Sequence, residues 1–323
     1  MILRKLLSAS VIALAISAAP VAASAQTGGL PEAVSPVVSP FPTTIDLMRC
    51  LVGQGVVLTS GHRAGPEPGY PENAIETAAH TLAQAPVLIE MDARTTRDGV
   101  LVFMHDDTLE RTTTGAGAVG AHSLAELQAL RLKDDEGTVT DFSIPTLTQT
   151  LEFMRGRGIL AIDVKEDASI PAIAEAVRAA DARNYTLINL YRPSQARAFH
   201  RIDPQLSLIH PVNSLADLEV LQLVGVNLRA LTAWTGIDRI DPRDQSLWAA
   251  LRREGVPVMF ATLFVADRDV AAGGGGEIFN GLADDGVDVI PTDHHLEAFA
   301  ILDGRRNTGA GLAACGALGK SRH

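Results

Sequence analysis

The sequence has few cysteines, few cations and, beyond its first residues, no long hydrophobic run. Cys50 and Cys315 are the only cysteines among 323 residues, and neither has the context of a catalytic nucleophile. Lysine and arginine number 27 against 38 aspartates and glutamates, a formal charge of −11 that argues against nucleic acid as a partner. An anionic substrate must then be attracted locally, by a metal ion or a few placed cations. Because no later stretch is apolar for long enough to cross a bilayer, we expect no stable membrane insertion.

The N-terminal segment has the pattern of an export signal. Arg4 and Lys5 precede an apolar run over 6–19, and small residues follow up to Ala25. This pattern predicts a signal peptide over 1–25, cleaved after Ala25, and therefore an exported protein that is periplasmic or secreted. An N-terminal membrane anchor is the alternative. Export would place the two cysteines where a disulfide persists, but the sequence alone leaves open whether they pair.

Beyond the signal, the chain alternates short apolar runs with amphipathic helical stretches. Residues 26–44 are rich in proline and predict an extended lead-in, 45–304 a single barrel domain, and 305–323 a C-terminal tail. Alternating strands and helices indicate a parallel sheet, and eight strands are the number of a closed (β/α)₈ TIM barrel, with an open doubly wound sheet as the alternative. The eight predicted strands are 56–60, 87–92, 159–164, 186–190, 206–210, 226–231, 256–261 and 287–291.

One further apolar run, over 100–105, follows the second strand too closely for a crossover helix. It therefore predicts an antiparallel β-hairpin extension of the barrel, with Asp98-Gly99 as a two-residue turn. That turn would place Asp92 opposite His105. The glycine- and charge-rich segment 106–143 that follows predicts a small insertion over the active face.

Carboxylates and one lysine gather near the carboxyl ends of two predicted strands. Glu90 and Asp92 are two residues apart, and so are Asp163 and Lys165, so each pair points to one side of its strand. Like charges that share a face repel unless a cation lies between them. Oxygen ligands suit a hard ion, and no histidine–cysteine zinc pattern occurs, so we expect one divalent cation, Ca²⁺ or Mg²⁺.

Short motifs follow one another in a fixed order around these residues. They are His62-Arg63, Pro71-Glu72-Asn73, Glu90-x-Asp92, Thr96-Arg97-Asp98-Gly99, His105-Asp106, Arg111-Thr112-Thr113, Ile144-Pro145-Thr146-Leu147, Asp163-x-Lys165 and Thr292-Asp293. This ordered string resembles the glycerophosphodiester phosphodiesterase family, whose members are TIM-barrel phosphodiesterases of the phospholipase C-like type. The resemblance extends from about residue 56 to 293 and is faint between 185 and 264.

The resemblance implies a role for each matching residue. Two histidines would act as acid and base, three carboxylates would hold the metal ion, and two cations would hold the phosphate oxygens. The implied acid–base pair is His62 and His105, the metal ligands are Glu90, Asp92 and Asp163, the phosphate-binding residues are Arg63 and Lys165, and Glu72 would contact the metal ion or its water.

Three departures from the family pattern concern the loop after His62, one metal ligand and the substrate wall. Ala64 replaces a usual glycine, and Asp163 replaces a usual glutamate, which shortens one ligand by a methylene. The region 256–263 lacks the usual Trp and Asn, so Met259 and Phe260 are expected to line a different wall.

The sequence therefore predicts a phosphoric diester hydrolase that converts a small-molecule glycerophosphodiester to sn-glycerol 3-phosphate and an alcohol. One alternative is a phospholipase or lyase of the same barrel superfamily, in which a substrate hydroxyl attacks phosphorus and a cyclic phosphate forms. Another is a binding protein that kept the fold and lost the chemistry. The preferred head group, the order of acid and base and the oligomeric state are left open.

Overall fold

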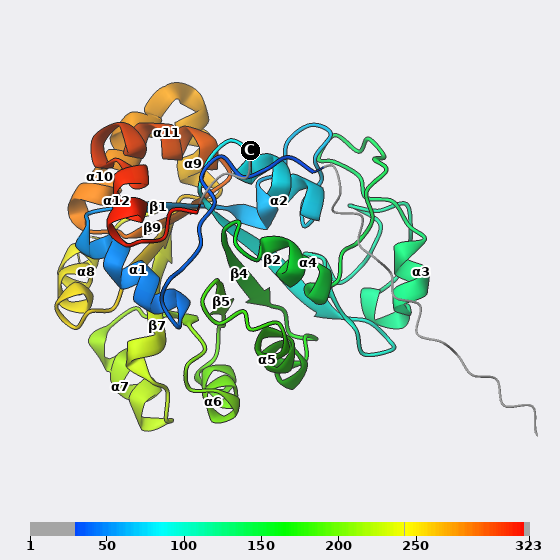
Figure 1. Cartoon of the computed structure of the whole chain (residues 1–323), viewed down its shortest axis with the longest axis horizontal. Coiled ribbons are helices and arrows are strands. Elements are labelled where there is room, and N and C mark those ends of the chain that lie inside the picture. The colour runs from blue at the N-terminus through cyan, green and yellow to red at the C-terminus, as the bar shows by residue number, and fades with distance from the viewer. Residues whose placement is uncertain (1–29, 242, 320–323) are drawn as a thin grey trace, which may run out of the picture.

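The computed structural model describes residues 30–241 and 243–319, so the expected signal peptide lies outside the described residues. Eight parallel strands form a ring in chain order that closes through pairing of β1 with both β9 and β2. This is the predicted (β/α)₈ barrel (Figure 1). The strands of the ring are β1 (Leu58–Gly61), β2 (Leu88–Thr95), β4 (Ile159–Val164), β5 (Thr186–Asn189), β6 (Leu208–Pro211), β7 (Leu231–Ile237), β8 (Val258–Ala261) and β9 (Val289–Thr292).

The predicted hairpin is present, but its predicted register was wrong by one residue. The short strand β3 (Leu101–Phe103) pairs antiparallel with β2, and Met104, not His105, donates its backbone N–H to the carbonyl of Asp92. The loop takes three residues instead of two, because Thr96 and Val100 still pair across it and Gly99 has φ of +80°. A left-handed glycine is the usual third residue of such a loop.

The strand predicted over 226–231 was placed too early. The structure has a short 3₁₀ helix, η3 (Leu228–Ala230), and β7 begins only at Leu231. The Asn227 side chain accepts a hydrogen bond from the backbone N–H of Arg229, and this local turn replaces strand pairing. The apolar run misled the prediction because Val226 is buried without being in a strand.

Helices surround the barrel and bury their apolar faces against the outward side chains of the strands. Along β2, Ile89 and Met91 point outward into this core, while Glu90 and Asp92 point into the barrel. The helices of this layer are α2 (Ile75–Leu82), α4 (Leu147–Met154), α5 (Ile170–Ala179), α6 (Pro193–Ile202), α7 (Leu215–Leu223), α8 (Asp244–Arg253), α9 (Val265–Asp269), α10 (Gly275–Asp285) and α11 (His295–Arg306).

Two further helices close the end of the barrel where the strands begin. α1 (Thr44–Gly53) follows the lead-in, and α12 (Thr308–Ala314) lies within the segment expected as a tail. Their buried side chains, Leu47 and Leu312 among them, join the lower interior of the barrel in one apolar cluster. Cys50 and Cys315 form a disulfide with Cα atoms 5.9 Å apart, which joins the two helices that lie together in Figure 1.

The segment 106–143 forms a small satellite core at the opposite end. It contains η2 (Val119–Ala121) and α3 (Leu124–Gln128), which begins with a capping box formed by Ser123 and Glu126. Its buried residues pack on β3, with Val102 and Leu109 at the centre. Within the described part of the chain, every helix is too short or too polar to cross a membrane.

Candidate active site

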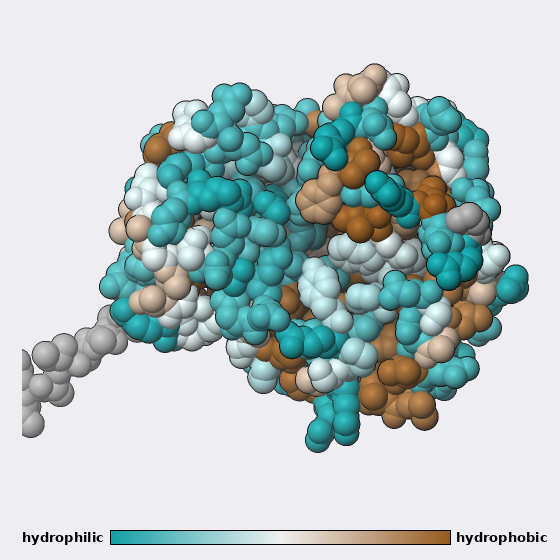
Figure 2. Space-filling view, turned by 180° about the vertical axis from the view of Figure 1, so that it is seen from behind, coloured by the Kyte–Doolittle hydropathy of each residue, from teal (hydrophilic) through white to brown (hydrophobic). Residues whose placement is uncertain are grey.

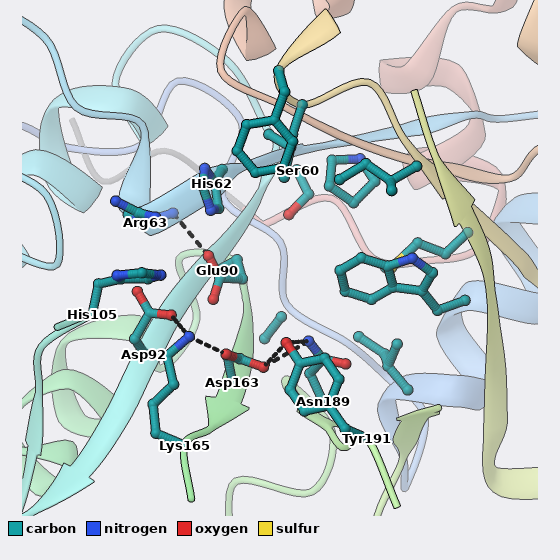
Figure 3. A pocket seen from close by; sticks show the side chains of 18 residues that line it. Ser60, His62, Arg63, Glu90, Asp92, His105, Asp163, Lys165, Asn189 and Tyr191 are labelled. Carbon is teal, nitrogen blue, oxygen red and sulfur yellow. Dashed lines mark hydrogen bonds and ion pairs between the residues drawn. The ribbon is translucent and has the colours of Figure 1, made fainter. Parts of the chain in front are cut away.

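A cavity of about 230 Å³ opens at the carboxyl ends of the barrel strands, and all eight strands or the loops that follow them contribute to it (Figure 3). This is the end at which barrel enzymes carry their chemistry. One wall is polar, and all the predicted site residues except Glu72 belong to it. These are His62, Arg63, Glu90, Asp92, His105, Asp163 and Lys165.

Three carboxylates converge on the floor of the polar wall. Asp92 and Asp163 are direct neighbours in the parallel pairing of β2 with β4, and Glu90 lies one inward position below Asp92. One oxygen from each carboxylate lies within 4.8 Å of the other two. The predicted acidic cluster is therefore formed by strand register, without help from any long loop.

One lysine neutralises part of this charge. Lys165 places its Nζ 2.7 Å from Asp92 Oδ1 and 2.6 Å from Asp163 Oδ2. Burial would raise the pKa of Asp92, but the Lys165 ion pair and an amide hydrogen bond lower it. Burial raises the pKa of Asp163 in spite of the same lysine. Burial and the two neighbouring aspartates raise the pKa of Glu90 well above its ordinary value.

The donor set fits a hard divalent cation. Three carboxylates and one ammonium leave a formal charge of −2 in a largely buried space, and all the candidate ligand atoms are oxygens. Burial first, and then repulsion from Asp92 and Asp163, raises the pKa of Glu90, and a cation among the three acids would relieve that repulsion. Glu90, Asp92 and Asp163 would hold the ion.

Neutral hydrogen-bond donors fix two of these carboxylates. Asn73, whose φ is +60°, donates its side-chain amide to Asp92 Oδ2 at 2.8 Å and accepts the Asp92 backbone N–H at 2.8 Å. Asn189 and Tyr191 donate to the same oxygen of Asp163, at 2.8 and 2.7 Å. No role in the site was predicted for Asn189, the last residue of β5, or for Tyr191, which lies two residues after it.

Two histidines flank the acids, and each is oriented by an aspartate. His62 Nδ1 lies 2.8 Å from Asp293 Oδ1, and His105 Nδ1 lies 2.8 Å from Asp106 Oδ1. A carboxylate on Nδ1 favours the tautomer that leaves Nε2 free to act. Both rings line the cavity, and in Figure 3 His62 lies above Glu90 and His105 to its left. The matched pair of imidazoles expected from the sequence is thus present.

The orienting aspartates are themselves held in different ways. Arg111 donates to both oxygens of Asp106, which with the His105 contact lowers the Asp106 pKa strongly. Burial would raise the pKa of Asp293, but the hydrogen bond to His62 lowers it. The backbone N–H of Asp293 donates to buried Asp267, which also accepts hydroxyl hydrogen bonds from Thr262 and Thr292, all at 2.7 Å.

Glu72 and Arg63 form part of a neighbouring ion-pair network. Arg63 donates to Glu72 Oε2 at 2.9 Å, and Arg111 bonds both oxygens of Glu72. Glu72 is 4% exposed and lies outside both the cavity lining and the three-acid cluster. Arg63 lines the cavity, and its backbone N–H donates to Glu90 at 2.8 Å. Arg63 therefore lies between Glu72 and the three-acid cluster.

The loop that directly follows His62 has a strained backbone. Arg63, Ala64 and Gly65 have φ of +53°, +74° and +78° in succession, and Ala64 is fully buried. Left-handed backbone costs a residue with a Cβ about 1–2 kcal/mol. The His295 ring fills the space behind Gly65, where an added Cβ would lie 2.3 Å from its Cε1. Strain held in place by packing is typical of functional sites.

The remaining wall of the cavity is apolar. Trp234, Met259, Leu263 and Phe264 line it from β7, β8 and the loop after β8. Met259 was expected here, whereas Phe260 points outward and packs edge-on against Trp248 with ring centroids 5.4 Å apart. Alternation along β8 dictates this difference, since neighbouring residues of a strand face opposite sides.

Comparison with known proteins agrees with this geometry. Residues 62–209 match the Glycerophosphoryl diester phosphodiesterase family. A glycerophosphodiester phosphodiesterase of Bacillus altitudinis is 30% identical over 158 residues, 46% of this chain and 63% of the relative, and one of Bacillus subtilis is 31% identical over 43% and 50%. The chain thus matches about half to two thirds of the length of these relatives.

Solved structures extend the likeness over the whole barrel. A glycerophosphoryl diester phosphodiesterase from Parabacteroides distasonis superposes with a TM-score of 0.76 at 30% identity, over 84% of this chain and 94% of its own. A phosphodiesterase from Oleispira antarctica, solved with its product sn-glycerol-3-phosphate, has the same fold at a TM-score of 0.62 and 20% identity, over 77% and 97%. The chain belongs to the glycerophosphodiester phosphodiesterase family.

Proposed function

We propose that the protein hydrolyses glycerophosphodiesters to sn-glycerol 3-phosphate and an alcohol. The observation that carries this proposal is the pair of imidazoles, each with an aspartate on Nδ1, at the sides of a cavity floored by three acids. Family membership supports the reaction class, and the product bound to the Oleispira relative supports the product.

The two histidines divide the proton transfers of hydrolysis. One imidazole accepts a proton from water as the water oxygen bonds to phosphorus, and the other donates a proton to the alcohol oxygen as its bond to phosphorus breaks. Asp293 and Asp106 keep His62 and His105 in the tautomer that exposes Nε2, and they stabilise the imidazolium that forms. A water molecule and a diester become a monoester and an alcohol, so atoms and protons balance.

Two cationic side chains in the cavity lining would bind the phosphate group of the substrate. Arg63 and Lys165 are the cationic side chains among the residues that line the cavity, and they supply positive charge to the phosphate oxygens. A divalent cation held by Glu90, Asp92 and Asp163 would polarise the phosphoryl group and offset the negative charge that develops on it. We propose Ca²⁺ or Mg²⁺, because carboxylate oxygens suit both ions.

Mutation of each histidine tests the proposal. We expect His62→Ala and His105→Ala to lower kcat for glycerophosphoethanolamine at least 100-fold while the melting temperature changes little. His122→Ala is the matched control, because His122 is partly exposed and its side chain bonds only the Ala118 carbonyl among the described residues. Full activity in either site variant, or after exhaustive chelation, would contradict the scheme.

Phosphorus NMR in ¹⁸O-enriched water separates hydrolysis from cyclisation. Hydrolysis places ¹⁸O in glycerol phosphate from the first turnover and shows no cyclic ester. A transient cyclic phosphate signal would instead assign attack to a hydroxyl of the substrate.

We also propose that the enzyme acts after export. The Cys50–Cys315 disulfide supports an oxidising compartment. N-terminal sequencing of the protein from its native cells should begin at Gln26; a sequence that begins at Met1 would contradict export by cleavage.

A further inference from the structure

The active-site cavity has two unlike walls, and only the polar one is used by the proposed reaction. The opposite wall comes from β6, β7, β8 and the loop that follows β8, and it carries no charged side chain among the described lining residues. Ile209, Met259 and Leu263 are 1–5% exposed at its base, and Phe264 is 65% exposed at the mouth. A small polar head group would leave this apolar surface unused.

The apolar surface continues from the mouth onto the outside of the molecule. Ile237 and Phe264, 36% and 65% exposed, line the opening, and Val265, 37% exposed, follows Phe264 directly in the chain. Figure 2 shows hydrophobic surface gathered on one side of a central hollow and hydrophilic surface on the other. An aliphatic chain of several carbons would therefore find continuous apolar contact from the base of the cavity to the rim.

Phe264 is held at the mouth against backbone strain. Its φ is +70° and its ψ is −91°, an unfavourable conformation for an aromatic residue. Asp238, in the loop after β7, accepts the N–H groups of Val265 and Ala266 at 3.1 and 3.2 Å and donates its own N–H to the Ala261 carbonyl. These hydrogen bonds connect the loops after β7 and β8. A strained backbone that the surrounding hydrogen bonds hold in place is typical of residues that contact a ligand.

We propose that the substrates of this enzyme are amphiphilic glycerophosphodiesters, in which one esterified group carries an aliphatic chain that lies along this apolar wall. The inference rests on the proposed function and names its substrate class. Two sources offer the same chemistry: an alkyl chain on the alcohol side of the diester, or an acyl chain on the glycerol side, as in a lysophospholipid.

A chain-length series tests the wall. Each methylene buried there contributes about fourfold to kcat/KM, so we expect glycerophosphoalkanols from methyl to hexyl to be hydrolysed with steeply rising kcat/KM. A parallel series of 1-acyl-glycerophosphoethanolamines identifies the source, because only the series whose chain lies on the wall rises with length. Equal kcat/KM along both series would overturn the inference, and hydrolysis of the methyl ester would still support the proposed function.

Two variants locate the effect in the structure. Phe264→Ala should flatten the rise of kcat/KM with chain length. Leu223→Ala should leave the rise unchanged, because Leu223 is 85% exposed at the end of α7, outside the cavity lining. An equal rise in the Phe264→Ala and wild-type proteins would also overturn the inference.

A binding measurement keeps the test independent of turnover. Titration calorimetry of the full-length His105→Ala protein with butyl, hexyl and octyl phosphate should show tighter binding with each added methylene. Binding that is independent of chain length would overturn the apolar subsite, whether or not any substrate is hydrolysed. Absence of hydrolysis in both series would separately refute the proposed function.

Discussion

Replacement of Lys165 by methionine would expose the electrostatic balance of the site. Methionine keeps most of the apolar stem but removes the ammonium that lies 2.7 Å from Asp92 and 2.6 Å from Asp163. The three carboxylates would then carry a formal charge of −3 instead of −2. We expect the free energy of unfolding to fall, because the buried carboxylates lose their protein-supplied counter-charge.

The size of the expected loss in unfolding free energy follows from the two short ion pairs of Lys165. At an effective dielectric constant of about 20, each pair is worth roughly 6 kcal/mol of attraction, most of which desolvation offsets. Removal of one partner of a buried pair costs about 3–5 kcal/mol, and the 18% exposure of Lys165 favours the lower figure. A loss of about 3 kcal/mol corresponds to a melting temperature lower by about 6–10 °C.

The loss should depend on pH with a definite sign. In the wild type, the pKa of Asp92 is lowered in the fold, so its contribution to stability is present above the unfolded pKa of about 4 and lost as the pH falls. Without Lys165, its folded pKa rises above that of the unfolded chain. The destabilisation should therefore be largest near pH 7, shrink as the pH falls towards 4, and disappear only further below 4, where Asp92 also becomes protonated in the wild-type fold.

Thermal unfolding of both proteins between pH 3.5 and 7, with a chelator and with millimolar Ca²⁺ or Mg²⁺, measures these effects. The cation should raise the melting temperature of Lys165→Met more than that of the wild type, because it neutralises a larger charge. Lys133→Met is the control, since its ammonium bonds only the Glu110 carbonyl among the described residues. Melting temperatures of Lys165→Met and wild type within about 1 °C of each other at pH 7 under chelation would refute the reasoning.

Two further predictions concern the ends of the barrel. The Cys50→Ala/Cys315→Ala variant should lose up to about 5 kcal/mol of stability in chemical denaturation, because the disulfide closes a loop of 265 residues; an unchanged midpoint would contradict this. Asp267→Asn cannot accept the Asp293 N–H in the same way, so His62 should lose its fixed orientation and kcat should fall about tenfold or more, with KM within twofold. A parallel fall in kcat and rise in KM would instead indicate a general loss of structure.

The sequence predicted most of the barrel because its signals are local. The run 159–164 became β4 without change, since a buried parallel strand is apolar on both faces except where it enters the site. The placement of α1 and α12 could not be predicted in this way. Their apolar faces pack under the barrel only after the ends of the chain meet, and no local pattern encodes that long-range contact.

The polar wall was predictable for the same reason. Glu90-x-Asp92 lies within β2, Asp163-x-Lys165 ends one residue after β4, and β2 and β4 are neighbours in the barrel. The apolar wall was largely missed. Trp234 lies in the strand whose position was predicted too early, and hydrophobic residues at strand ends carry no local signal that separates a substrate wall from ordinary core.

The two His–Asp pairs differ in the same way, because one depends on a local contact and the other on a distant one. His105 and Asp106 are adjacent in sequence, so their contact needs only the hairpin and Arg111. His62 and Asp293 are 231 residues apart and meet because β1 pairs with β9, where Gly61 lies opposite Thr292. One imidazole is thus oriented by contacts within one segment of the chain and the other by closure of the barrel, so the complete site depends on the pairing of the last strand with the first.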